Sequence, residues 1–254
     1  MVEAYRRRAT RRKLLLLECS IARYAPFAGC GKTLWELLAE QPWFVGPISP
    51  GPYSGHTLSR EERKQVHADG HQAVRWFEEY ADGAAGSDAV ARAENYFQWA
   101  EYFAEAERFG YDPTLLPGSE LRYGVASWLD TLSPNNLHLR NVLDFYLATY
   151  SGEFYCWGGW LPLHLDHRPV ALGLIADLLG SPLGLPPFAP AWRSSAAVAL
   201  AAGANSTNDF SSLPVLADAL EDAGCDEPAV LDHCRAGSRH ARGCWVVDAL
   251  LGRE

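Results

Sequence analysis

Residues 211–225 read SSLPVLADALEDAGC, and this stretch decides the fold class. Apolar residues recur every three or four positions, the spacing of one helical face, at Leu213, Leu216, Ala217 and Leu220. A serine, Ser211 or Ser212, is placed to cap the start, and Gly224 is placed to end the helix. The stretch therefore predicts a short amphipathic helix with definite ends.

The same pattern recurs in both directions along the chain. Apolar residues have helical spacing over residues 58–83, 88–109, 121–132, 139–150, 170–178, 191–202, 226–234 and 240–251. Alternating runs typical of strands are absent, and the linkers differ too much in length for a regular solenoid. The sequence predicts an all-α fold, an irregular multi-helix bundle with a C-terminal helical subdomain and no regular repeat.

Linker composition predicts how the chain is divided. Residues 1–168 are expected to form a helical body with an insertion-like loop at 25–57, and residues 169–254 a C-terminal helical subdomain. Residues 151–166 are rich in glycine and aromatic residues and are expected to be a loop between the two parts. An extended proline-rich connection is expected at residues 182–190.

Composition excludes several classes of protein. Hydrophobic residues make up 48% of the 254 residues and charged residues 21%, which is ordinary for a globular protein and unlike a disordered one. The net charge of −9 argues against a broad phosphate-binding surface, so nucleic acid is not an expected partner. No apolar run approaches the roughly 20 residues of a membrane-spanning helix, so no membrane association is expected either.

A basic segment lies near the N-terminus and consists of Arg6, Arg7, Arg8, Arg11, Arg12 and Lys13. An export signal would need an apolar segment of about 7 to 15 residues after the charges, whereas only Leu14 to Leu17 are uninterrupted. Together with six cysteines, too few for a disulfide scaffold of this size, this predicts a cytoplasmic protein. We interpret the basic segment as a solvated helix start, the alternative being an arm for nucleic acid or anionic lipid.

A group of thiol and imidazole side chains lies near the C-terminus and comprises Cys225, His233, Cys234, His240 and Cys244. Mixtures of cysteine and histidine suit zinc, which takes four ligands in structural sites. The spacing differs from familiar zinc signatures, because the pairs here are adjacent residues, or His240 and Cys244 four apart on one face of the expected last helix. The alternative is that the cysteines are small buried apolar residues.

A second candidate metal site lies at His67 and His71, which are four apart and share one helical face, with Glu78 further along. A zinc peptidase would carry glutamate directly after the first histidine, where Ala68 stands. Peptidase chemistry is therefore not expected. The alternative to metal binding is a pair of solvated histidines.

A third candidate is nucleotide binding at Gly29-Cys30-Gly31-Lys32-Thr33, which resembles the end of a phosphate-binding loop. The first glycine of that motif would fall on Pro26, which has no N–H to offer a phosphate. The alternative is a loop whose Lys32 and Thr33 open a helix.

Two further sets of residues are candidates for roles other than metal binding. The aromatic loop is a candidate contact surface or ligand pocket, at Trp157, Trp160, His164 and His167, although the loop can equally be folded over the core. Asp218 and Asp248 lie within apolar helical segments near basic residues, a pattern that predicts ion pairs linking helices before it predicts acid–base chemistry.

Several of these motifs resemble a large paralogous family of planctomycete proteins. The similar segments are Arg12-Lys13-Leu14, Ala81-Asp82-Gly83, residues 174–182 and 190–193, and, most specifically, residues 213–225, His233-Cys234-Arg235 and residues 240–248. The resemblance covers roughly half of the chain. It implies a mostly helical fold and a bacterial, cytoplasmic protein, and it implies no activity or site residues.

The sequence thus leads to three hypotheses about function. The first is a non-enzymatic protein-interaction or regulatory module with a protein partner and no cofactor. The second is a metal-dependent or thiol-dependent enzyme, with zinc at the C-terminal cysteine and histidine group. The third is nucleotide binding at Lys32.

Overall fold

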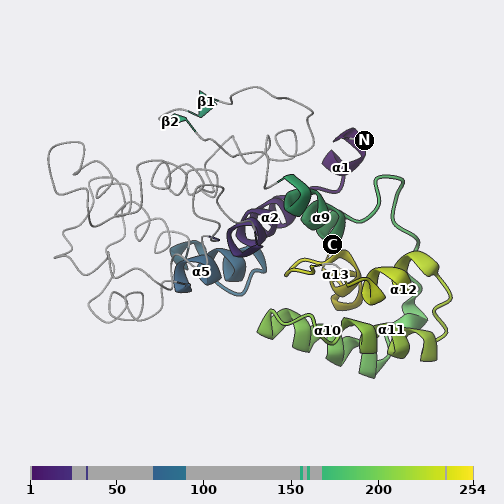
Figure 1. Cartoon of the computed structure of the whole chain (residues 1–254). Coiled ribbons are helices and arrows are strands. Elements are labelled where there is room, and N and C mark those ends of the chain that lie inside the picture. Colours follow the sequence, from purple (N-terminus) through teal and green to yellow (C-terminus); the bar gives the residue numbers. More distant parts are fainter. Residues whose placement is uncertain are drawn as a thin grey trace, which may run out of the picture. The chain divides into compact units, whose positions relative to one another are not determined.

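The fold is known from a computed structural model, which describes residues 2–24, 33, 71–89, 155–156, 159–160, 168–237 and 239–253 (Figure 1). These residues form helices in an irregular arrangement without a regular repeat, so the predicted all-α class is confirmed for this part of the chain. The elements are α1 (Val2–Arg6), α2 (Arg11–Tyr24), α5 (Gln72–Ala81), α9 (Arg168–Leu179), a 3-10 turn η4 (Pro190–Trp192), α10 (Ser195–Thr207), α11 (Leu213–Asp222), α12 (Pro228–Arg235) and α13 (Trp245–Leu251).

The described strands are β1 (Tyr155–Cys156) and β2 (Gly159–Trp160), which pair antiparallel with Tyr155 opposite Trp160. They lie in the segment expected to be a loop, and two-residue strands are too short to change the fold class. The helices expected over residues 121–132 and 139–150, nearly all of 88–109, and the insertion-like loop apart from Thr33 lie outside the described residues.

The chain divides into two compact units. One unit comprises Met1–Lys13 and Leu172–Glu254, here called the C-terminal unit, and the other comprises Leu14–Ala171. The C-terminal unit therefore includes the basic N-terminal segment, an association that linker composition alone did not suggest. Helices α2 and α9 each cross the division.

The core of the C-terminal unit forms where α10, α11, α12 and α13 pack against one another (Figure 1). The predicted apolar face of α11 is buried in it, at Leu213, Leu216, Ala217 and Leu220. Burying one such leucine contributes roughly 1.5–3 kcal/mol, so this face holds the helix in place. Gly224 follows α11 with φ of 83°, which confirms the predicted helix end.

Helix α9 contributes an apolar stripe of Leu174, Ile175 and Leu178, all buried, and Gly180 ends it as predicted. Gly180 has φ of 70°, and a Cβ atom at this position would collide with the Leu185 side chain. Glycine is thus required here by both the backbone conformation and the close approach of the following loop. The same helix buries one carboxylate, Asp177, next to Leu178.

The last helix is shorter than predicted. It begins at Trp245 rather than near residue 240, so the expectation that His240 and Cys244 share a helical face is wrong. Gly243 has φ of 91° and Cys244 an extended ψ of 130°, and both values are incompatible with a continuous helix. Residues 239–244 therefore form a loop that leads into α13, with the Cys244 amide donating to the Ala241 carbonyl.

In the unit Leu14–Ala171, the run Leu14 to Leu17 of α2 is buried. Arg23 of α2 makes two bonds to the buried Glu78 of α5, from Nε at 2.7 Å and from Nη2 at 2.8 Å. This bidentate ion pair compensates the charge of the Glu78 carboxylate, whose burial without a partner would be unfavourable. Among the described residues, no helix combines the length and the apolarity needed to cross a membrane.

Candidate metal centre

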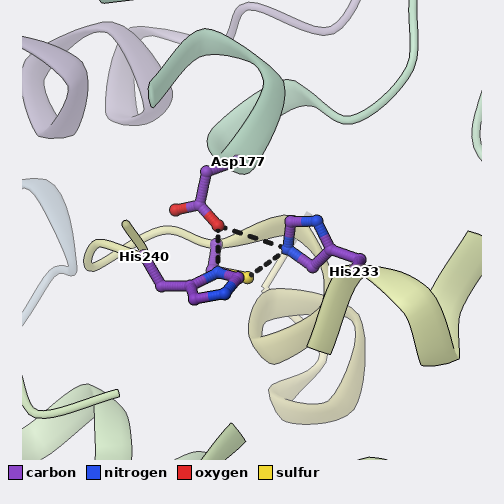
Figure 2. A group of neighbouring side chains, drawn as sticks. Asp177, His233 and His240 are labelled. Atoms are coloured by element: carbon purple, nitrogen blue, oxygen red, sulfur yellow. Dashed lines mark hydrogen bonds and ion pairs between the residues drawn. The ribbon is translucent and has the colours of Figure 1, made fainter. Parts of the chain in front are cut away.

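Four potential metal ligands from three parts of the C-terminal unit meet at one point. Asp177 comes from α9, His233 from α12, and His240 and Cys244 from the loop before α13. One ligand atom from each residue lies within 4.8 Å of the other three. Figure 2 shows the Asp177 carboxylate and the imidazole rings of His233 and His240 pointing toward one another.

Two of the distances between ligand atoms are close to those of a tetrahedral site. With the usual zinc bond lengths, neighbouring nitrogen, oxygen and sulfur ligands lie about 3.3–3.6 Å apart. His233 Nε2 lies 3.2 Å from Asp177 Oδ1 and 3.2 Å from Cys244 Sγ. His240 Nδ1 lies closer to the same Asp177 oxygen, at 2.7 Å, so a metal entering the group has to separate this pair slightly.

Further contacts hold these side chains in position. The Ala241 amide donates to Asp177 Oδ2 at 2.8 Å, which leaves Oδ1 to face the two imidazoles. The His233 ring packs edge-on against His240, with centroids 4.9 Å apart, and also against Trp245 at 5.3 Å. Such outer contacts orient ligands in metal sites, because they limit rotation of the carboxylate and the rings.

Burial, hydrogen bonds and neighbouring charges together shift the pKa values of Asp177 and Cys244. Burial by itself raises the pKa of Asp177, but hydrogen bonds and the charges of His240 and His233 outweigh it, and the pKa is lowered. Burial raises the pKa of the Cys244 thiol well above its usual value, and the nearby Asp177 carboxylate adds to this shift. The thiol is therefore protonated at neutral pH, and a metal that binds it displaces this proton.

The arrangement differs from a catalytic triad of cysteine, histidine and aspartate. In a triad the imidazole uses one nitrogen for the nucleophile and the other for the carboxylate. Here His233 uses the same atom, Nε2, for both Cys244 and Asp177. A buried, protonated thiol is also a weak nucleophile. Convergence of all four groups on one point is the geometry of a metal site.

The structure brings together three of the five residues singled out in the C-terminal sequence, His233, His240 and Cys244. The other two, Cys225 and Cys234, lie outside this group, although they are buried in the same apolar core as Cys244. Burial raises the pKa of Cys234 to about 12, with a further contribution from Asp177, so this thiol stays neutral. These two cysteines match the alternative of small buried apolar residues.

The fourth member, Asp177, was not anticipated from the sequence. A signal for it exists, because Asp177 interrupts an apolar helical stripe in the same way as Asp218 and Asp248. Those two aspartates do form ion pairs. Asp218 pairs with Arg235 at 2.9 Å on the surface, as expected for an ion pair between helices, and Asp248 pairs with Arg12 and Lys13.

The remaining candidates lie wholly or partly outside the described residues. His67, Lys32, Trp157, His164 and His167 are outside them, and of Trp160 the backbone alone is described, in β2. His71 lies at the start of α5, and both carboxylate oxygens of Glu78 are bonded to Arg23. The metal site expected at His67, His71 and Glu78 therefore stays a prediction, with Glu78 already engaged in an ion pair.

No protein-family model, curated protein or solved structure matches this chain.

Proposed function

We propose that the C-terminal unit is a zinc-binding helical module, in which one metal ion joins α9, α12 and the loop before α13. The observation that carries this proposal is the convergence of Asp177, His233, His240 and Cys244 within 4.8 Å. Two imidazoles, a thiolate and a carboxylate are ligand types that zinc accepts, and hard cations such as magnesium avoid the sulfur.

Four protein ligands favour a structural role for the metal over a catalytic one. Catalytic zinc sites keep an open position for water or substrate, whereas structural sites use four protein ligands. Three of the four residues here are buried and His233 is nearly so, which also limits access by a substrate. The proposal is therefore a non-enzymatic module, in preference to a metal-dependent or thiol-dependent enzyme.

Metal content tests the proposal directly. Wild-type protein purified without chelator is expected to contain near-stoichiometric zinc, measured by elemental mass spectrometry. His233→Ala and Cys244→Ala are expected to lose most of it, because three remaining ligands hold structural zinc poorly. Cys225→Ala is the matched control, a buried cysteine of the same unit outside the cluster, and is expected to keep its zinc. Equal zinc in Cys244→Ala and Cys225→Ala contradicts the site.

We further propose that the whole protein is an interaction or regulatory module, bacterial and cytoplasmic, and related to the planctomycete family that its motifs resemble. Support comes from the proline-rich segment between α9 and η4, where Leu183 is 98% exposed and Leu185 is 42% exposed. Extended proline-rich segments lose little entropy when a partner protein binds them.

Co-purification tests this second part of the proposal. A protein partner is expected to be recovered with the wild-type chain and to be reduced severalfold with Leu183→Asp, because the substitution places a charge where an apolar contact is needed. Quantitative mass spectrometry of the recovered proteins measures the ratio. Leu172→Asp, another exposed leucine outside the segment, is the matched control. Equal recovery with all three chains, or no specific protein under several growth conditions, argues against an interaction through this segment.

A further inference from the structure

The basic N-terminal segment, residues 2–13, contacts the region around the metal ligand Cys244. Lys13 Nζ donates to the Gly243 carbonyl at 2.5 Å and also bonds to Asp248. Arg12 makes two bonds to Asp248, at 2.6 and 2.9 Å. The side chains of Asp248 and Lys13 are only 3% and 10% exposed, so these charges are buried together. The expected solvated helix start is therefore wrong for these two basic residues.

The same segment contacts the end of α9, which carries the metal ligand Asp177. Arg8 donates from Nη1 to the Leu179 carbonyl at 2.5 Å and from Nη2 to the Ser181 carbonyl at 2.7 Å. A guanidinium at this position satisfies the Leu179 carbonyl in the last turn of α9, and it interacts favourably with the helix dipole. Arg8 thus fixes the turn that follows Asp177.

The two sets of contacts flank the metal ligands in the chain. Gly243 directly precedes Cys244, and the Asp248 amide donates to the Cys244 carbonyl at 2.9 Å. On the other side, Leu179 follows Asp177 by two residues. The N-terminal segment therefore bonds to the end of α9 and to the loop before α13. These are two of the elements that carry the four candidate ligands.

We infer that Arg8, Arg12 and Lys13 are positioning residues of the metal site, and that metal binding and docking of the N-terminal segment are coupled. This inference rests on the proposed zinc site. Coupling is reciprocal by thermodynamic necessity, since a segment that raises metal affinity is itself held more firmly when the metal is bound. Chelation would thus weaken the docking of residues 2–13 by the same factor.

Two features of the segment make the coupling large enough to measure. Lys13 contacts the backbone of the residue next to a ligand, so losing this contact allows Cys244 to move relative to Asp177. Loss of a contact made directly to a ligand typically reduces metal affinity by about 10–100-fold, and for a contact one residue from a ligand we expect the lower end, about 10-fold. The contacts are also buried, so they are screened little by salt.

The first test compares zinc affinity in variants that keep all four ligands. Lys13→Met retains the apolar stem of the side chain and removes its charge, and is expected to weaken zinc binding about 10-fold at unchanged stoichiometry. Competition with a chromogenic chelator measures the affinity. Arg7→Met is the matched control, because Arg7 is an exposed residue of the same segment. Equal affinities for wild type, Lys13→Met and Arg7→Met overturn the inference.

The second test uses the wild-type chain and decides the matter if Lys13→Met does not fold. Hydrogen exchange of peptides covering residues 2–13 is expected to become at least severalfold faster after zinc is chelated, whereas peptides from α5, in the unit Leu14–Ala171, change less. Unchanged exchange of residues 2–13, in protein shown to have lost its zinc, overturns the coupling and leaves the zinc site standing. A wild-type chain that binds no zinc at any concentration overturns both.

Discussion

Removal of zinc from the wild-type protein is expected to lower the stability of the C-terminal unit by several kcal/mol. A ligand that binds the native state alone stabilises it by about 4 kcal/mol when its free concentration is a thousand times its dissociation constant. For a unit of this size each kcal/mol corresponds to roughly 4–8 °C in melting temperature. We therefore expect a fall of at least about 15 °C, measured by calorimetry with and without chelator.

The physical reason lies in how the ligand-bearing elements are joined. Asp177 and His240 lie 63 positions apart in the chain, and their contact closes a long loop. A metal ion replaces three polar contacts among these side chains by four coordination bonds, and it does so in the folded state alone. His233→Ala is expected to have the melting temperature of the zinc-free wild-type protein, whether or not chelator is present. A melting temperature unchanged by complete loss of zinc would contradict a structural role.

Asp248→Asn is expected to destabilise the protein by about 3–5 kcal/mol, since it removes the buried carboxylate that the buried Lys13 and the partly buried Arg12 share. The carboxylate of Asp248 accepts bonds from both Arg12 and Lys13, and its side chain is 3% exposed. Asparagine has nearly the same shape, so the loss reports charge rather than packing. Urea unfolding monitored by circular dichroism measures it.

Asp218→Asn is the matched control for this substitution. Asp218 also accepts a bond from an arginine, Arg235, but its side chain is 70% exposed and the pair lies in solvent. Exposed ion pairs contribute little, because water solvates both charges when they separate. We expect no resolvable change for Asp218→Asn. Equal urea midpoints for the two variants would mean that the pairing of Asp248 is as weak as a surface pair.

Helices could be predicted where a single local pattern determines them. The apolar stripe of α11, the glycine after it, and the glycine that ends α9 all depend on residues within a few positions of each other. The start of α13 was misplaced because Cys244, Val247 and Leu251 align at helical spacing, which suggested a helix from about His240. The backbone at Gly243 breaks that helix, and a glycine alone does not reveal its φ angle.

The candidate site was predicted only in part, because the sequence shows those ligands that lie near one another along the chain. Three of its ligands lie close together near the C-terminus and have recognisable chemistry, so His233, His240 and Cys244 could be named as candidates. Cys225 and Cys234 have the same chemistry, and only the packing of the helices shows that Cys244, and not these two, meets the imidazoles and Asp177. Aspartate is too common a residue type for Asp177 to be singled out from the sequence. Asp177 also lies 63 positions before His240, so the sequence does not indicate that the two side chains meet.

The sequence by itself determined that the described part of this protein is helical, where several helices end, and which residue types are available near the C-terminus. These properties follow from interactions between residues three to five positions apart, which a linear pattern records. Tertiary structure alone decided that Asp177 joins two histidines and a cysteine, and that Arg8, Arg12 and Lys13 dock beside them rather than face solvent. Such contacts depend on how helices pack in three dimensions, and burial then gives the charges and thiols their chemistry.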